Sequence, residues 1–255
     1  MLFYEDIDWD RYFNATNEAL ELISRIRKNP KLGDIAKVNG AATVGEAYLV
    51  KEFLKDSMPM DDSQLKFINT GGIDKYLSFY GKEKIRYLKG AYEYPSVSKA
   101  DLGKMSERRL QESQTEKIII GGMNKELECI YDDGQYLAGK STTIVYGHDY
   151  LKYITAVLNS SLMTFYYRTY YNSMTLQGGY LRIGAPQVKN LPICIPSLEI
   201  IKCIEEKVDK IQSVLNLNGE YTDETNSIYK EIDDLIYQVY GFSSSDIEIA
   251  SVEAK

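Results

Sequence analysis

The chain has 255 residues, of which 44% are hydrophobic and 26% are charged, and its formal net charge is −7. This composition is that of a globular protein with a hydrophobic core and excludes a wholly disordered chain. The longest apolar runs, such as residues 118–120 and 191–195, are far shorter than the roughly 20 residues that a membrane-spanning helix needs. The first ten residues carry four acids and no base, unlike a secretory signal peptide, so we expect a cytoplasmic protein.

Thiol and imidazole groups are too few to build the common metal or histidine-dependent sites. Cys129, Cys194 and Cys203 are odd in number and lack a C-x-x-C spacing, and His148 is the only histidine. We therefore expect no disulfide framework, no zinc site and no catalytic triad. We interpret the cysteines as buried reduced thiols and His148 as a capping or solvated residue.

The first half of the chain predicts short elements separated by glycine turns. A helix is expected after a cap at Asn14 or Thr16, with one apolar face and a stop at Asn29-Pro30. Residues 82–111 are basic, rich in tyrosine and without regular periodicity, which indicates a long functional loop. This half also predicts a strand at residues 31–38, a helix at residues 44–55, a strand at residues 64–68 and a glycine turn at residues 70–72.

The second half predicts a sheet followed by helices. Residues 149–171 have apolar side chains at spacings of three and four, typical of one long helix. Three runs rich in isoleucine, threonine and tyrosine, at residues 116–120, 127–131 and 142–146, predict an antiparallel meander. A further strand is predicted between prolines, at residues 191–195.

Two heptad-like patterns close the chain. Ser197 is a possible helix cap, and apolar residues recur from Ile201 to Leu215 and again from Ile228 to Val239, before Gly241. They predict a helical pair, either covering the core or docking on another domain. We therefore expect an α+β fold, a mixed and largely antiparallel sheet with flanking helices and a C-terminal helical pair. The predicted domains are an N-terminal helical segment, a recognition domain and a helical hairpin, at residues 1–30, 31–196 and 197–255.

One formal motif match points to a nucleoside triphosphatase. Residues 134–141, GQYLAGKS, satisfy G-x-x-x-x-G-K-[ST], in which backbone amides cradle phosphates at the start of a helix. Here the interior of the motif favours a strand, and the β-branched residues after Lys140-Ser141 disfavour the required helix. We keep this activity only as a minor alternative.

Other catalytic signatures are missing. All six prolines are isolated, which excludes the adjacent prolines of the amino-methyltransferase signature [DNS]-P-P-[YFW]. No F-x-G-x-G segment for S-adenosylmethionine is present, and Glu205-Glu206-Lys207 reads as a solvated helix face rather than as a nuclease centre. We expect no catalytic residue in this chain.

The charge is distributed unevenly along the chain. Residues 66–125 contain twelve Lys or Arg and seven Asp or Glu, whereas the residues after Pro196 contain five and thirteen. Bases that neutralise phosphates, interleaved with tyrosines and amides, are typical of a nucleic-acid interface. A solvated basic face has the same composition, so the segment alone leaves both readings open.

The order of several short segments resembles the target-recognition domains of TaqI-type adenine methyltransferases and of fused restriction-methylation enzymes. The similarity lies in LGDIAKV with GAATVG, KFINTGGID, KIII with YD, YL through LNS, GGYLR, VKNLPI and EIDDLIYQVYG, over residues 30–245. Gly121-Gly122 stands where that pattern has an arginine. Type I specificity subunits are similar in style but carry two such units.

The resemblance implies sequence-specific recognition of double-stranded DNA in a bacterial restriction-modification system. Catalysis and S-adenosylmethionine binding would belong to a methyltransferase or nuclease domain or subunit. We predict phosphate contacts from Lys82, Lys84, Lys99, Arg108 and Arg109, and base contacts from Tyr92, Tyr94, Ser98 and Gln111. The predicted interface also includes Lys66, Asn69, Thr70, Arg86, Lys89 and Lys104. The alternative from another class is a protein-interaction module whose tyrosines form a dry contact surface.

Overall fold

The computed structural model describes residues 15–253 and shows an α+β fold, as the sequence predicts. The opening acidic residues and Asn14 lie outside the described part. The helices are α1 (Asn17–Ile26), α2 (Leu32–Ile35), α3 (Val44–Phe53), α4 (Lys99–Met105), α5 (Glu107–Gln114), α6 (Leu151–Asn159), α7 (Ser161–Tyr170), α8 (Ala185–Lys189), α9 (Leu198–Asn218), α10 (Asp223–Val239) and α11 (Ser244–Glu253), with 3-10 turns η2 (Thr70–Gly72) and η3 (Asn172–Met174). The strands are β1 (Lys37–Gly40), β2 (Lys55–Asp56), β3 (Gln64–Ile68), β4 (Ile73–Asp74), β5 (Leu77–Ser78), β6 (Ile85–Tyr87), β7 (Gly90–Tyr92), β8 (Pro95–Ser98), β9 (Lys117–Gly121), β10 (Met123–Asn124), β11 (Cys129–Asp132), β12 (Tyr136–Ala138), β13 (Thr142–Tyr146) and β14 (Leu181–Arg182).

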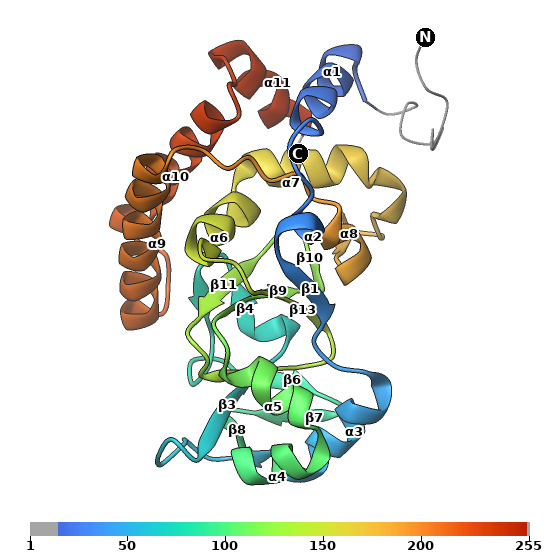
Figure 1. Cartoon of the computed structure of the whole chain (residues 1–255), viewed down its shortest axis with the longest axis vertical. Helices are drawn as coiled ribbons and strands as arrows, with labels where there is room; N and C mark the ends of the chain where they lie inside the picture. Colours follow the sequence, from blue (N-terminus) through green and yellow to red (C-terminus); the bar gives the residue numbers. More distant parts are fainter. Residues whose placement is uncertain (1–14, 254–255) are drawn as a thin grey trace.

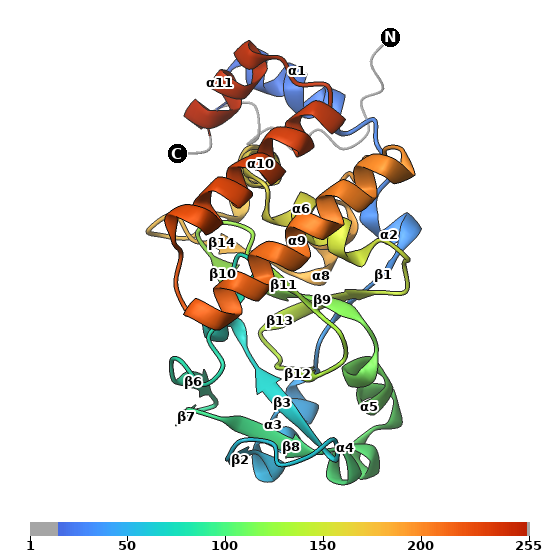
Figure 2. The ribbon, with the colours of Figure 1, turned by 90° about the vertical axis from the view of Figure 1, so that its left-hand side faces the viewer.

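The elements gather into two lobes along the long axis of the molecule (Figure 1), and the same two lobes lie one above the other in the view of Figure 2. The helical lobe contains the antiparallel sheet β1-β13-β9-β11, with α1, α2 and α6 to α11. The small lobe, at the bottom of Figure 1, contains the sheet β12-β3-β8-β2, the hairpin β6–β7 and helices α3 to α5. Each lobe has its own apolar cluster, and a third cluster lies between the two sheets.

Strand β9 lies at the centre of the helical lobe because both of its faces are apolar. Ile118 and Ile120 pack among the helices, whereas Ile119 joins the cluster that faces the small lobe. All five residues of β9 are buried. A strand buried on both faces reads as a continuous apolar run.

Strand β11 is an edge strand of this sheet, yet amide side chains pair its outward backbone groups. Asn159 of α6 accepts from the backbone N–H of Cys129 (2.9 Å) and donates to its carbonyl (2.9 Å). Gln212 of α9 likewise accepts from the Tyr131 backbone N–H (3.1 Å) and donates to the Tyr131 carbonyl (2.8 Å). The two amides therefore take the place of a neighbouring strand and fix two helices to the sheet.

A buried ion pair joins β9 to the end of β11. The Lys117 ammonium contacts the Asp132 carboxylate, and both side chains are almost fully buried. Asp132 also accepts from the backbone N–H groups of Gln135 (2.9 Å) and Tyr136 (3.2 Å). The pair thus holds the turn that carries the chain from the helical lobe into β12 of the small lobe.

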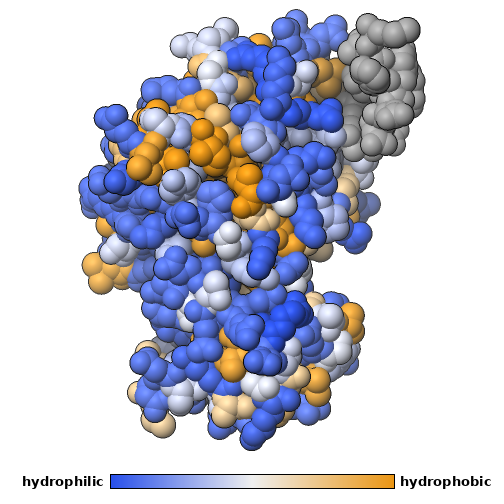
Figure 3. All heavy atoms as spheres, viewed as in Figure 1, coloured by the Kyte–Doolittle hydropathy of each residue, from blue (hydrophilic) through white to orange (hydrophobic). Residues whose placement is uncertain are grey.

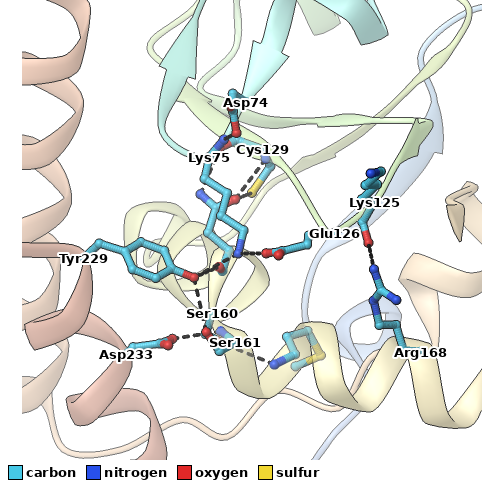
Figure 4. Close-up of polar contacts among 12 residues, drawn as sticks. Asp74, Lys75, Lys125, Glu126, Cys129, Ser160, Ser161, Arg168, Tyr229 and Asp233 are labelled. Carbon is cyan, nitrogen blue, oxygen red and sulfur yellow. Dashed lines mark hydrogen bonds and ion pairs between the residues drawn. The ribbon is translucent and has the colours of Figure 1, made fainter. Parts of the chain in front are cut away.

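Helix α10 is fixed to the sheet by a second polar network (Figure 4). The Lys75 ammonium pairs with the Glu126 carboxylate and donates to the Tyr229 hydroxyl at 2.9 Å, and Asp233 accepts from the Ser161 backbone N–H at 2.8 Å. Burial lowers the pKa of Lys75, but the contacts with Tyr229 and Glu126 outweigh burial and hold that pKa above its usual value. Lys75 is therefore a charged structural residue.

Several sequence predictions are confirmed. Thr16 caps α1 by accepting from the Ala19 N–H, and α3, β3 and the α9–α10 pair lie where they were expected. His148 accepts from the Tyr150 N–H at 3.0 Å in the turn before α6.

No helix within residues 15–253 is long and apolar enough to cross a membrane.

Other predictions about the elements were wrong. The predicted loop at residues 82–111 contains β6, β7, β8, α4 and α5, because elements of three to eight residues are too short to show a period. The predicted strand at 31–38 is instead α2 followed by β1. The predicted strand at 191–195 forms only an isolated bridge, between Lys31 and Pro192. Cys203 is exposed rather than buried.

Two predictions had the right elements but the wrong connection. The predicted meander is a sheet in which β9, not β11, lies between its two neighbours, because β12 leaves to pair with β3 in the small lobe. The predicted helix at 149–171 breaks at Ser160, which is extended and caps α7 by accepting from the Met163 N–H.

Asn159→Leu is expected to lower the free energy of unfolding by about 2–3 kcal/mol, because it leaves the buried N–H of Cys129 without a partner. Gln212→Met should cost only about 1 kcal/mol, because Gln212 is half-buried and water can replace its amide. Urea denaturation measures both values. An unchanged free energy of unfolding in Asn159→Leu would contradict the proposed pairing of the β11 edge.

Candidate nucleic-acid interface

A basic hollow of about 510 Å³ lies on the small lobe. One wall is residues 86–91 of the β6–β7 hairpin, the other is Lys140 with Ser141, and Asn69 lies between them. Arg86, Lys89 and Lys140 are all exposed. Three cations from two distant segments therefore border one concave surface.

The β6–β7 hairpin directs its basic side chains outward. Ile85 and Tyr87 are buried, and successive residues of a strand point to opposite faces, so Arg86 points to solvent. The Tyr87 hydroxyl donates to the Ala47 carbonyl of α3 at 3.0 Å. This contact fixes the inner face of the hairpin to the small lobe.

The hairpin turn has a strained backbone. Leu88 and Lys89 form its two-residue loop, with φ of 39° and 67°. A two-residue turn of this hand requires positive φ at both positions and is usually made by Asn-Gly. Lys51 of α3 donates to the Leu88 carbonyl at 2.7 Å and thereby holds the turn, with Lys89 at its tip.

Asn69 positions the two walls of the hollow. Its side-chain amide donates to the Arg86 carbonyl at 3.2 Å and accepts from the Ser141 N–H at 3.3 Å. The side chain is buried, so its hydrogen-bonding groups serve the protein rather than a ligand. The structure therefore changes Asn69 from a predicted contact into a positioning residue.

The segment of the apparent nucleotide-binding motif forms the other wall. Residues 136–138 are strand β12, as the sequence predicts, and Lys140-Ser141 lead into β13 rather than into a helix. Thr70 accepts from the Gly122 N–H at 3.1 Å and donates to the Ser141 carbonyl. Thr70 thus supports the loop, and Lys140 is the exposed cation that the sequence prediction of the interface missed. Its Gly-Lys-Ser context was the available signal.

Two predicted phosphate-binding arginines are occupied elsewhere. Arg109 is 2% exposed and donates to the Ala138 carbonyl at 2.8 Å. Burial lowers its pKa, while Glu46 and Glu112 act in the opposite direction. Arg108 pairs with Glu112 at 3.0 Å and with Glu46 at 3.4 Å. The prediction for Arg109 is therefore corrected, because its buried guanidinium cannot reach a phosphate.

Two predicted lysines also have protein partners. Lys82 donates to the Leu215 and Asn216 carbonyls at the end of α9, at 3.0 and 2.8 Å. Lys66 lies over the rings of Tyr80 and Tyr136. It also borders a second hollow with Lys99, on the side of residues 59–65. These lysines do not border the basic hollow.

The remaining predicted residues are distributed around the small lobe. Tyr92 lies beside the basic hollow, since its ring covers Gly90. Tyr94 packs against Tyr80 instead, and Lys104 faces Asp101 at 3.8 Å. Lys84 is exposed just before β6, Ser98 precedes α4, and Gln111 is exposed on α5.

The described residues offer no evident metal centre. Within residues 15–253, no group of three or more His, Cys, Asp or Glu side chains could hold a metal ion.

A protein-family model, the TaqI-like C-terminal specificity domain, matches residues 74–193. The matched segment, residues 74–193, is therefore similar to a TaqI-like specificity domain. This domain contains the β6–β7 hairpin and Lys140, and hence most of the basic hollow. No curated protein sequence matches the chain.

Two solved structures match most of the chain. One is the type IIG restriction endonuclease BpuSI, with 11% identity and a TM-score of 0.47 over 89% of this chain. The other is the type IIL restriction-modification enzyme MmeI in complex with DNA, with 12% identity and a TM-score of 0.39 over 88% of this chain. The present chain spans 34% of each of those chains.

Gly122, in the segment where the sequence resemblance predicts an arginine, has no room for a side chain. A Cβ atom at Gly122 would lie 2.4 Å from the Ser141 carbonyl oxygen. An arginine at this position would displace the loop that carries Lys140. The chain therefore lacks the arginine predicted near Gly122, and Gly122 packs closely against the loop that carries Lys140.

Lys89→Gly is expected to raise the free energy of unfolding by about 0.5–1 kcal/mol, because a left-handed backbone is costly for any residue with a Cβ atom. Lys84→Gly is the matched control and should lower it by about 0.5–1 kcal/mol, because Lys84 lacks a positive φ. Thermal and urea denaturation measure both. A loss of stability in both variants would show that the turn is not strained.

Proposed function

We propose that this chain is the DNA target-recognition part of a bacterial restriction-modification system and has no catalytic centre of its own. The observation that carries the proposal is the convergence of Arg86, Lys89 and Lys140 on one hollow of a TaqI-like specificity domain. Lysine and arginine side chains neutralise DNA phosphates and release counterions, which supplies affinity without sequence information.

Sequence information requires side chains that reach base edges. Arg86 can donate two parallel hydrogen bonds to guanine, and Tyr92 lies beside the same hollow. Of the predicted base contacts, Tyr92 is the one best supported by its position. Lys84 extends the basic border along β6.

The proposal assigns catalysis to a methyltransferase or nuclease domain or subunit that also binds S-adenosylmethionine. It is supported by the family match, because a specificity domain selects the target on which another part of the enzyme acts. The acidic α9–α10 pair is the surface we assign to that partner, since its charge disfavours contact with DNA.

A protein-interaction role would need an exposed apolar surface. On the face shown in Figure 3, apolar residues gather over the helical lobe near α7 and α10, and the small lobe is mainly hydrophilic. Ile195, Leu198 and Ile200 are exposed at the start of α9. Exposed apolar side chains also occur on the small lobe, at Val44, Tyr48, Leu49, Met58 and Met60. The assignment of the small lobe to DNA therefore depends on its basic hollow and not on apolar exposure.

Replacing Arg86, Lys89 and Lys140 together with alanine should reduce the slope of log K against log salt concentration by roughly 2–3, because each phosphate contact contributes about 0.9. The control replaces Lys28, Lys202 and Lys230, which are exposed on the helical lobe, and removes the same charge. Fluorescence anisotropy with a labelled duplex gives the slopes. Equal slopes for both triple variants would refute the assignment of the hollow to DNA.

The isolated chain should neither methylate nor cleave a duplex supplied with S-adenosylmethionine and Mg²⁺, because catalysis is assigned to the partner. Transfer of a labelled methyl group and gel electrophoresis measure the two activities. Turnover by the pure chain, lost in no-protein controls, would overturn the non-catalytic assignment.

A further inference from the structure

The α9–α10 pair contacts the segment that leads into the basic hairpin. The Tyr221 hydroxyl, between the two helices, donates to the Lys75 carbonyl at 2.9 Å. Lys75 in turn donates to Tyr229 of α10, as Figure 4 shows. Lys82 donates to the last turn of α9. Residues 75–82 are thus held at both ends by the helical pair.

Lys82 is well suited to the end of a helix. The Leu215 carbonyl also accepts from the Gly219 N–H at 2.8 Å, whereas helix ends leave carbonyls without a partner within the helix, and the helix dipole places partial negative charge there. The chain leaves α9 through Gly219, whose φ is 83°. A Cβ atom at Gly219 would lie 3.1 Å from Cδ of Lys82, so the side chain packs along the helix end as well as capping it.

The position of Lys82 in the chain connects this cap to the proposed interface. Strand β6 begins at Ile85, three residues after Lys82, and Arg86 follows. A change in the cap therefore acts on the base of the hairpin whose exposed face carries the cations. Burial lowers the pKa of Lys82, in agreement with an ammonium that contacts protein.

We propose that Lys82 is a positioning residue that couples the α9–α10 pair to DNA binding, rather than a phosphate contact. This inference rests on the proposed function. By capping α9, Lys82 fixes the β6–β7 hairpin relative to the helical lobe. A partner seated on α9–α10 would then affect DNA affinity through the orientation of the hairpin, and DNA would affect partner binding equally.

Two glycines provide a matched test of the coupling. Gly219 and Gly241 both follow helix ends with positive φ, 83° and 69°, so alanine strains the backbone similarly at each. A new Cβ atom meets Lys82 only at Gly219, and nothing within 4 Å at Gly241. We compare Lys82→Ala, Gly219→Ala, the double variant and Gly241→Ala.

Lys82→Ala and Gly219→Ala should each weaken duplex binding roughly 3- to 30-fold, the range expected for coupling through a positioning residue. The salt slope should stay unchanged in both, and the double variant should be no weaker than either single variant. Gly241→Ala should lose similar stability but bind DNA as the unaltered chain does. Lys82→Arg, which retains donors, should recover most of the affinity.

A fall of about 0.9 in the salt slope of Lys82→Ala would identify Lys82 as a phosphate contact and overturn the inference. Equal DNA affinities of Gly219→Ala and Gly241→Ala, or an additive double variant, would also overturn it.

Hydrogen exchange without DNA separates this inference from the proposed function. Backbone amides of residues 85–92 should exchange faster in Lys82→Ala and Gly219→Ala than in Gly241→Ala. If the unaltered chain binds no duplex, the proposed function fails, whereas the exchange result still decides whether Lys82 positions the hairpin. Unchanged exchange in both variants would show that it does not.

Discussion

The hydrogen bonds from Asn159 and Gln212 to the outward backbone groups of β11 are the constraint on which the arrangement depends. An edge strand exposes N–H and C=O groups that another chain can pair with. Here side-chain amides from α6 and α9 occupy those groups, and in doing so they attach both helices to the sheet. The protection of one edge therefore determines where the helical lobe lies.

The position of the small lobe follows from the same sheet. Ile119 of β9 packs in the cluster between the two sheets, and the Lys117–Asp132 pair fixes the turn into β12. Strand β12 pairs in parallel with β3 and leads to Lys140, and Asn69, just after β3, bonds the Lys140 loop to the hairpin. The packing of Ile119 and the Lys117–Asp132 pair thus help to set the distance between Lys140 and the basic residues of the β6–β7 hairpin.

The apolar pattern of α9 and the apolar run of β3 could be predicted from the sequence, whereas the short elements between residues 85 and 114 could not. The heptad pattern from Ile201 to Leu215 is buried as expected, because about four turns of helix repeat it enough to be recognised. The β6–β7 hairpin escaped prediction because its turn uses Leu88-Lys89, residues that rarely adopt positive φ.

The candidate site was predictable in composition but not in geometry. A count of charges located the basic segment, yet Arg109 is buried and Lys82 caps a helix, which only tertiary contacts decide. Lys140 lies outside that segment and reaches the hollow because β12 pairs with β3. The family motifs carry mainly structure, since the asparagine of LNS, Asn159, binds β11 and the following Ser160 caps α7.

The central claim is that the basic hollow of the small lobe is the surface that meets DNA. Lysine acetylation, read by mass spectrometry with and without a duplex, tests it most directly. The account predicts that Lys89 and Lys140 lose reactivity when the duplex binds, whereas Lys202 and Lys230 on the helical pair react as before. Protection of the helical-pair lysines, with Lys89 and Lys140 still reactive, would contradict it.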